Sequence, residues 1–201
     1  MITNVIFDCG QVLIRYNEVE IASHCTDNAA DAEILGKVGM SRKYWECFDR
    51  GTLEEADYLV QVKQELPEHL HTAVEKLSEA WVKCCPPMPG MEEIVCDVKK
   101  TGKTLYLLSN FNKRLRYEQH YISALQYFDH LVISGEIKKA KPDREIYEYL
   151  LSTYNLVPDE CIFIDDNPAN IAMAESLGIH GYFFDFDVPK LREYLKKENL
   201  I

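Results

Sequence analysis

The stretch VIFDCGQVLI, residues 5–14, starts with an apolar run that ends at an acid, Asp8. A continuous apolar run that contains β-branched residues is typical of a strand buried on both faces of a parallel sheet. The runs KTLYLLSN (103–110) and ECIFIDDN (160–167) have the same form, and each ends in polar residues. Two shorter runs, HLVISG and GIHGYFF, predict further strands at 130–135 and 178–184.

Helical patterns separate these predicted strands. They cover residues 90–102, 112–128, 143–155 and 168–178. Prolines stand near two of the expected helix starts, and glycines stand at two of the expected ends. Strands that alternate with helices favour crossover connections and a doubly wound parallel sheet, so the predicted fold class is α/β.

Residues 16–87 interrupt this alternation, because they contain helical patterns alone. These patterns cover residues 17–38, 41–49, 53–66 and 69–84. The stiff segment CCPPMPG then closes the stretch. We therefore predict a small all-helical subdomain at 16–87, inserted after the first strand of an α/β core formed by residues 1–15 and 88–201.

The composition and net charge limit the kinds of molecule that the protein is expected to bind. The 201 residues are 47% hydrophobic and 27% charged, which is typical of a folded globular protein, and their formal net charge is −11. Nucleic acids and anionic membranes carry the same sign of charge, so neither is expected as a partner. Seven cysteines without regular spacing indicate reduced thiols and a cytoplasmic location, and no stretch approaches the 18 apolar residues of a membrane span.

Acidic side chains follow two of the predicted core strands. The carboxyl ends of parallel strands meet along one crevice, so Asp8, Asp165 and Asp166 are expected to lie close together. Crowded carboxylates repel one another unless a cation lies among them, and hard oxygen ligands suit Mg²⁺. A phosphate-bearing substrate would complete the ligand shell. Taken singly, each acid is better explained as the end of a strand or the cap of a helix, and it is the three in one crevice that favour a site.

Two further segments add donors to the same crevice. Lys141 directly precedes a proline-initiated helix, and a cation beside paired acids would steady a carboxylate and a phosphate oxygen. Its alternative is a solvated charge in a basic run. Ser109 and Asn110 end another core strand with a hydroxyl, an amide and the backbone N–H groups of a loop that opens a helix, all suited to phosphoryl oxygens, although the same pair also caps helices.

Four segments, in order and spacing, resemble the four motifs of the haloacid dehalogenase-like (HAD) superfamily. They are FDCGQVL, LLSNFNKRL, SGEIKKAKPDREIY and FIDDNPANIAMAESLGI. The resemblance covers about 1–15 and 88–201 and implies a Rossmann-like core, and the helical insert resembles the small helical cap of that superfamily. The first and fourth motifs are similar to the branch that includes a bacterial α-glucose-1-phosphate phosphatase.

This resemblance implies a role for each acid. Asp8 would be the nucleophile that accepts the phosphoryl group as an aspartyl phosphate, which divides hydrolysis into two steps. Mg²⁺ would be held by the Asp8 carboxylate, the main-chain carbonyl of Gly10 and Asp166. Asp165 would lie beside the metal and act through water.

The resemblance also implies which residues handle the phosphate. Ser109 and Asn110 would bind the phosphoryl oxygens, with Asn167 as a weaker candidate for the same shell. Lys141 would orient Asp8 and offset its charge. The helical cap would close over the site and select the substrate.

Gly10 departs from the family pattern. Most phosphatases of the superfamily carry a second aspartate there, a general acid and base worth about 10²–10⁴ in rate. Gln11 cannot replace it, because an amide does not titrate in the useful range. Three explanations are open: water or metal assists the leaving group, a cap residue lends a proton, or activity is low. The cap candidates are His24, Glu46 and Asp49.

The sequence thus predicts a Mg²⁺-dependent phosphatase for small phosphorylated metabolites, with sugar phosphates such as α-glucose 1-phosphate as the first substrates to test. One alternative is a metal-independent 2-haloacid dehalogenase, which also uses an aspartate nucleophile; the pair Asp165 and Asp166 argues against it. A second alternative is a catalytically weak binding or regulatory protein, which Gly10 favours and the intact Asp8, Lys141 and Asp166 oppose.

Overall fold

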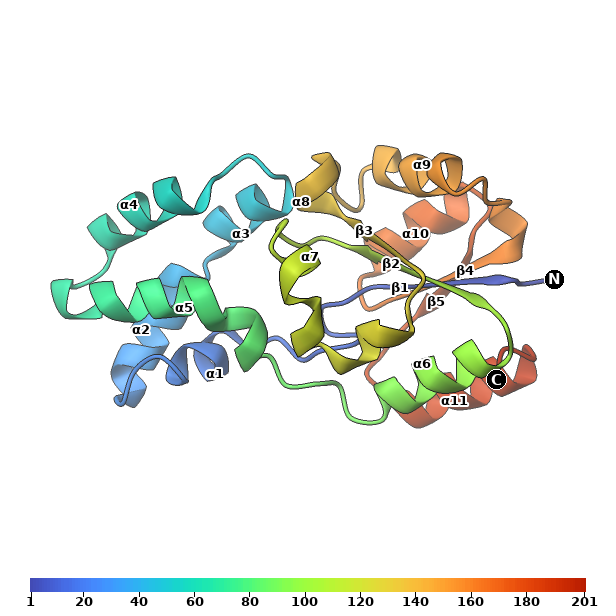
Figure 1. The fold of residues 1–201 in the computed structure, drawn as a ribbon, viewed down its shortest axis with the longest axis horizontal. Coiled ribbons are helices and arrows are strands. Elements are labelled where there is room, and N and C mark those ends of the chain that lie inside the picture. Colours follow the sequence, from blue (N-terminus) through green and yellow to red (C-terminus); the bar gives the residue numbers. More distant parts are fainter.

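The computed structural model describes residues 1–201 and contains one five-stranded sheet that is parallel throughout (Figure 1). Its strands are β1 (Asn4–Phe7), β2 (Thr104–Ser109), β3 (His130–Ile133), β4 (Cys161–Asp165) and β5 (His180–Phe183). They lie in the order β3-β2-β1-β4-β5, so the direction of winding reverses beside β1. This arrangement confirms the predicted doubly wound α/β fold.

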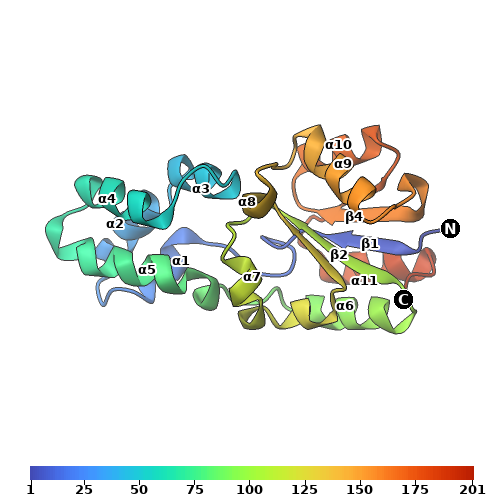
Figure 2. The same ribbon diagram turned by 45° about the horizontal axis from the view of Figure 1, so that its top comes forward.

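Helices cover both faces of this sheet (Figure 2). They are α6 (Met91–Lys100), α9 (Arg144–Thr153), α10 (Pro168–Ser176) and α11 (Val188–Lys197). Buried side chains of α6 and α11 join the larger hydrophobic core, and those of α9 and α10 join the smaller one. None of the helices is long and apolar enough to span a membrane.

The central strand β1 shows why its sequence is apolar at successive positions. Val5 and Phe7 join the larger core, Ile6 joins the smaller one, and all three are fully buried. Side chains of a strand alternate between the two faces of its sheet, and here both faces are covered. The first polar residue after this buried run is Asp8, which begins the loop that follows β1.

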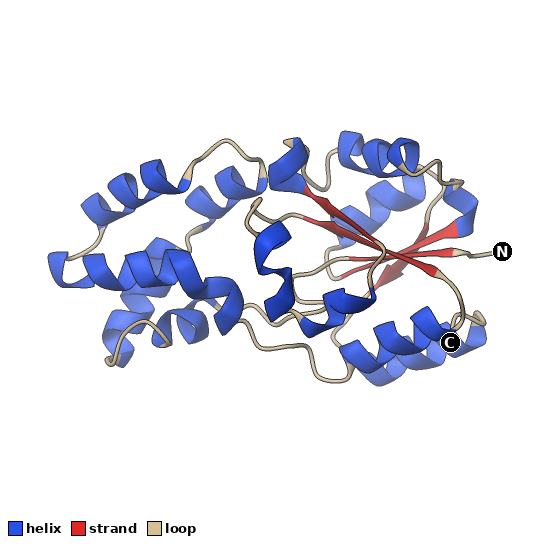
Figure 3. Ribbon diagram, viewed as in Figure 1, coloured by secondary structure: helices blue, strands red, loops and turns tan.

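Five helices form a separate group beyond the carboxyl end of the sheet (Figure 1; Figure 3). They are α1 (Glu18–Ser23), α2 (Ala29–Gly39), α3 (Arg42–Asp49), α4 (Glu55–Glu65) and α5 (His71–Cys84), with the 3₁₀ turn η1 (Glu68–Leu70) before α5. Their buried side chains are continuous with the larger core of the sheet. We call residues 16–87, which contain these helices, the helical insert.

The two connections between the sheet and the helical insert lie side by side. Ile14 pairs with Pro87 in an antiparallel bridge. The Arg15 backbone N–H donates to the Pro86 carbonyl at 2.8 Å, and the Met88 N–H donates to the Leu13 carbonyl at 2.9 Å. The chain therefore enters and leaves the insert through one short paired segment.

Two helical predictions are wrong in detail. The pattern at 17–38 forms α1 and α2 instead of one helix, because the Asn28 side chain accepts from the Ala30 backbone N–H and caps a new helix. The pattern at 112–128 forms only α7 (Leu115–Glu118) and two 3₁₀ turns, η2 (Gln119–Tyr121) and η3 (Ser123–Tyr127). These short turns together bury Leu115, Ile122 and Leu125 in one core.

The strand predicted at 130–135 ends early, at Ile133, and the short helix α8 (Ser134–Ile137) follows. The Phe111 backbone N–H donates to Ser134 Oγ at 3.0 Å, and the Gly135 N–H donates to the Phe111 carbonyl at 3.0 Å. These bonds draw the chain out of the sheet toward the loop after β2. A 3₁₀ turn, η4 (Pro158–Glu160), likewise precedes β4.

Candidate active site

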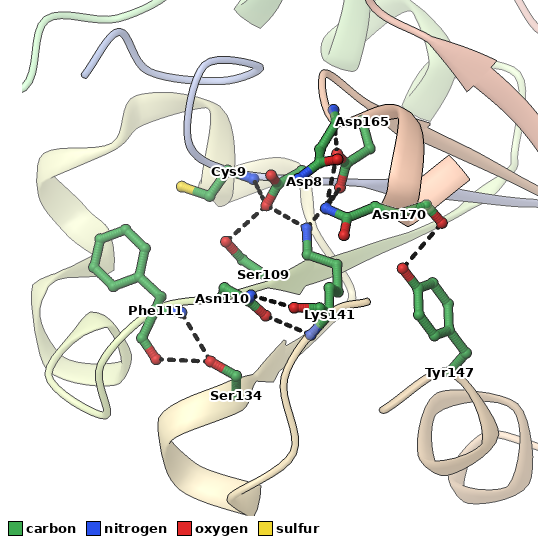
Figure 4. Close-up of polar contacts among 11 residues, drawn as sticks. Asp8, Cys9, Ser109, Asn110, Phe111, Ser134, Lys141, Tyr147, Asp165 and Asn170 are labelled. Carbon is green, nitrogen blue, oxygen red and sulfur yellow. Dashed lines mark hydrogen bonds and ion pairs between the residues drawn. The ribbon is translucent and has the colours of Figure 1, made fainter. Parts of the chain in front are cut away.

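Polar side chains from four segments meet at the carboxyl edge of the sheet (Figure 4). Asp8 directly follows β1, Ser109 ends β2 and Asp165 ends β4. Lys141 comes from the loop between α8 and α9. Because β1 and β4 are neighbours at the point where the winding reverses, the two acids lie where an open α/β sheet places its ligand crevice.

One carboxylate oxygen of Asp8 is held by three donors. Its Oδ1 accepts from the Cys9 backbone N–H at 2.6 Å and from Ser109 Oγ at 2.8 Å, and it lies 2.8 Å from Lys141 Nζ. Asp8 is only 9% exposed. Burial raises the pKa of Asp8 to about 6, and the positive charge of Lys141 opposes that rise. The second oxygen, Oδ2, has no hydrogen-bond partner in the protein.

Lys141 bridges two acids. Its Nζ lies 2.7 Å from Asp165 Oδ2 and 2.8 Å from Asp8 Oδ1, and its side chain is 1% exposed. Burial alone lowers the pKa of a lysine, but the charges of Asp165 and Asp8 outweigh it, so the pKa of Lys141 is raised. Lys141 is thus a fixed cation in the site and not a solvated charge.

The Asn110 side chain faces Lys141. Asn110 Nδ2 donates to the Lys141 carbonyl at 2.8 Å, and the Lys141 backbone N–H donates to Asn110 Oδ1 at 2.7 Å. The amide therefore holds the lysine's main chain, which sequence reasoning missed. The Asn110 backbone N–H has no acceptor in the protein, so this group, and not the side chain, is free to bind an oxyanion.

Asp165 has every lone pair engaged. Its two oxygens accept from Asn170 Nδ2 at 3.0 Å each, Oδ1 accepts from the Asn167 backbone N–H at 2.8 Å, and Oδ2 contacts Lys141. Asp165 is fully buried. The Asn167 side chain accepts from the Ala169 N–H and caps α10, so it is occupied as well.

Asp166 differs from its neighbour. Its side chain is partly exposed and has no hydrogen-bond partner in the protein. Burial, and next the charge of Asp165, raise the pKa of Asp166. One carboxylate oxygen each of Asp8, Asp165 and Asp166 lies within 4.8 Å of the others. Asp8 Oδ2 and the Asp166 carboxylate have no partner in the protein, and hard oxygens of this kind beside a third carboxylate fit a divalent cation such as Mg²⁺.

Asn170 is a site residue that sequence reasoning missed. It lies in the first turns of α10, is 5% exposed, and its carbonyl accepts from Tyr147 Oη at 3.0 Å. The signal for it was a polar residue among the apolar positions that α10 buries beside Ile171 and Ala174. Such a residue on a buried helix face is expected to have a specific partner.

Gly10 lies in open space. A Cβ added there would have nothing within 4 Å, and its backbone φ is not in the left-handed region. The neighbouring Gln11 uses its amide elsewhere: Nε2 donates to the Tyr16 carbonyl and Oε1 accepts from the Tyr16 N–H, both at 3.1 Å. Gln11 thus holds the entry to the helical insert and takes no part in proton transfer.

A cavity of about 840 Å³ lies outside this cluster of site residues. It lies between the helical insert and the loops after β2 and β3, and Asp8 is not part of its wall. Aromatic side chains of the insert, Trp45, Phe48 and Trp81, form its apolar side, and Arg114 is among its charged residues. It is a cleft between insert and core, and not the carboxylate cluster itself.

The fold and the site together define an α/β protein with a carboxylate cluster at the switch point of a parallel sheet. The chain belongs to the haloacid dehalogenase-like hydrolase family, whose model matches residues 2–178. The predicted membership in the HAD superfamily is confirmed.

Among curated proteins, the chain is similar to a sesquiterpene phosphatase of Aspergillus oryzae, with 29% identity over 182 residues that cover 88% of this chain and 86% of that protein. A D-ribitol-5-phosphate phosphatase of Bacteroides thetaiotaomicron is 23% identical over 192 residues, covering 90% and 91%. A solved HAD family enzyme of the same bacterium, in complex with magnesium and inorganic phosphate, shares the fold: the TM-score is 0.65 at 20% identity, covering 91% and 94%.

Proposed function

We propose that this protein is a Mg²⁺-dependent phosphatase that hydrolyses small phosphate monoesters through an aspartyl phosphate on Asp8. The observation that carries the proposal is the pairing of a buried, oriented aspartate with a cluster of carboxylates that fits a divalent cation. The family membership and the two phosphatases among its relatives support the same reaction.

The site residues have distinct proposed roles. Asp8 attacks phosphorus, and Ser109 with Lys141 holds its carboxylate in one orientation. Asp8, Asp166 and the main-chain carbonyl of Gly10 would hold Mg²⁺, which would offset the negative charge on the phosphoryl oxygens. Asp165 fixes Lys141 and would contribute to the metal shell only through water, because its lone pairs are already engaged.

The phosphate is bound by groups on the loop after β2. The hydroxyl of Ser109 lies beside the nucleophile. The backbone N–H of Asn110, the next residue, has no acceptor in the protein and would donate to a phosphoryl oxygen. The Asn110 side chain contributes indirectly, through the main chain of Lys141. Asn167 is left with a capping role.

We further propose that residues 16–87 act as a cap over a core formed by 1–15 and 88–201. The paired connection at Ile14 and Pro87 supports this division, since both crossings between the parts occur there. Sugar phosphates are the proposed substrate class, with α-glucose 1-phosphate first, because the first and fourth motifs resemble those of that phosphatase branch.

A panel of phosphate esters tests this function. We expect hydrolysis of several sugar phosphates and of 4-nitrophenyl phosphate in Mg²⁺, loss of activity in EDTA, and recovery when Mg²⁺ is returned. We also expect Mg²⁺ to raise the melting temperature, because a cation that binds only the folded state stabilises it by about 2.7 kcal/mol at 100 times its Kd.

Two outcomes would contradict the proposal. Release of chloride from 2-haloacids without metal, and no ester turnover, would instead identify a dehalogenase. No turnover of either class of substrate would identify a binding protein that retains the fold.

A further inference from the structure

The end of helix α3 lies directly against the core at Gly135 of α8 and at Asp143. Gly51 has φ +60°, and a Cβ there would be 2.5 Å from the Gly135 carbonyl oxygen. A Cβ on Gly135 would in turn be 3.0 Å from the carbonyl oxygen of Phe48. Arg50 Nη1 donates to Asp143 Oδ2 at 2.6 Å, two residues after Lys141. The insert is therefore in backbone contact with the core on both sides of one residue, Asp49.

Asp49 is the acid of the helical insert that lies between these contacts with the core. Its side chain is partly buried, and the charges that influence it most are Asp8 and Lys141 of the core, then Glu46 and Arg50 of its own segment. The charge of Asp49 is also among the causes that raise the pKa of the Tyr16 phenol, at the entry to the insert. Burial, and next the negative charge of Asp8, raise the pKa of Asp49 to about 7.

The other candidates in the insert lie elsewhere. Glu46 is exposed and pairs with Arg42 one turn away on α3. His24 is exposed at the end of α1. Tyr16 is a poor proton donor, because burial raises the pKa of its phenol far above the usual range.

We infer that Asp49 is the general acid and base of this enzyme, supplied by the helical insert in place of the carboxylate that Gly10 lacks. The inference rests on the proposed phosphatase function and adds the missing proton transfer to it. Gly10 leaves open space beside Asp8, and the contacts of Gly51 with Gly135 and of Arg50 with Asp143 hold the end of α3, which carries the Asp49 carboxyl, against the core near Lys141.

The proton balance of the two steps is complete with Asp49 alone. In the first step an Asp8 oxygen bonds to phosphorus and the bond from phosphorus to the ester oxygen breaks. That oxygen keeps the electron pair and takes the proton of the neutral Asp49 carboxyl. In the second step the Asp49 carboxylate takes a proton from water as the water oxygen attacks phosphorus. The bond to Asp8 breaks, inorganic phosphate leaves, and both carboxyl groups return to their starting states.

The variant Asp49→Asn tests this role, because the loss of a general acid should slow only those esters whose leaving group needs a proton. For the sugar phosphate that the wild-type protein hydrolyses best, we expect kcat/KM to fall about 10²–10⁴-fold. For 4-nitrophenyl phosphate we expect kcat/KM to fall less than about 10-fold, because nitrophenolate leaves without a proton. For the same ester we expect kcat to fall more than kcat/KM, because the attack of water on the aspartyl phosphate still needs the base. A burst of nitrophenol equal to the enzyme concentration should therefore appear.

Glu46→Gln is the matched control, because it removes the same charge from the same helix at an exposed position. We expect both esters to be hydrolysed at wild-type rates. A rescue variant separates proton transfer from a structural effect. Gly10→Asp in the Asp49→Asn background has room for its side chain. We expect kcat/KM of this double variant for the sugar phosphate to be at least about 10-fold higher than that of Asp49→Asn alone.

The pH profile of the wild-type protein gives a test that needs no variant. Asp49 must be protonated to donate, so kcat/KM for the sugar phosphate should fall on the alkaline side while that for 4-nitrophenyl phosphate should not. Equal losses for both esters in Asp49→Asn, no rescue by Gly10→Asp, or identical pH profiles would overturn the inference. A wild-type protein that hydrolyses no ester would instead overturn the proposed function.

Discussion

Asp8 is buried, and three donors contact one of its carboxylate oxygens. Its burial makes the stability of the folded protein depend on pH. Its pKa is higher in the folded protein than in the unfolded chain because burial disfavours the charged form. A carboxyl of this kind contributes stability at low pH that is lost as the pH rises from about 4 to about 6, through the unfolded and folded pKa values. Above that window the ionised nucleophile costs stability, and Lys141 reduces the cost.

This balance between burial and pairing predicts the effects of the substitution Asp8→Asn. The substitution keeps the shape of the side chain and removes the nucleophile, so we expect turnover to fall at least about 10³-fold. At neutral pH the melting temperature without metal should be unchanged or higher, because a costly buried charge is gone while Asp165 still pairs with Lys141. Steady-state kinetics and thermal unfolding measure both effects.

Full activity in Asp8→Asn would show that another residue is the nucleophile. Loss of activity together with a collapsed melting temperature would show that Asp8 acts through the fold. The Asp49→Asn variant provides the comparison at the same scale, since it removes a carboxyl from the insert and leaves the three donors of Asp8 in place.

Among the elements, α10 has a larger part in the site than its sequence suggested. The helix begins at Pro168 and turns Asn170 back onto both oxygens of Asp165, which ends β4. Tyr147 of α9 then bonds to the carbonyl of Asn170. Two helices on one face of the sheet thus hold the acid that fixes Lys141.

Asn170→Ala should loosen that arrangement. A residue that orients a metal-site carboxylate typically changes metal affinity or activity about 10–100-fold, and we expect a fall in kcat and a rise in the Mg²⁺ concentration required for half-maximal activity. Asn28→Ala is the control, because it removes a helix cap in the insert at a cost of about 0.5–2 kcal/mol without touching the site. An unchanged Mg²⁺ dependence in Asn170→Ala would argue against the positioning role.

At the scale of the whole molecule, the boundary between insert and core decides whether the site is complete. Ion pairs cross it, including Arg50 with Asp143 and Lys113 with Glu54. The side chains of both pairs are between about half and two-thirds exposed, and such pairs contribute little to stability. The contact of Gly51 with Gly135 leaves no room for a side chain and sets how closely the two parts approach.

Gly51→Ala should therefore displace the insert. Alanine at a positive φ costs about 1–2 kcal/mol, and here its Cβ would also meet the Gly135 carbonyl. We expect kcat/KM for sugar phosphates to fall about 10-fold or more, since Asp49 moves away from Asp8. Thermal unfolding and ester kinetics measure the two parts of the effect.

Gly102→Ala is the matched control. Its φ is +79° and nothing lies within 4 Å of a Cβ there, so it has the same backbone cost without a contact across the boundary. We expect similar destabilisation and wild-type kinetics. Equal kinetics in the two variants would show that the close approach at Gly51 does not matter for catalysis.

Local patterns in the sequence determined the parallel sheet, the polar ends of β1, β2 and β4, and the helical character of the chain between β1 and β2. They did so because strand and helix periodicities, and the end of each apolar run, depend on neighbouring residues alone. The residues predicted for the carboxyl edge meet there for the same reason: every strand of a parallel sheet ends at that edge.

Only the tertiary structure decided which side chains face which. The pairing of Asn110 with the main chain of Lys141, the hold of Asn170 on Asp165, and the contact that brings Asp49 to the core all join distant or differently directed segments. Their geometry depends on how helices pack on the sheet and how closely two backbones approach at a glycine. No local pattern encodes those distances, so the sequence offered Asp49 as one of three candidates and the packing of the insert singled it out.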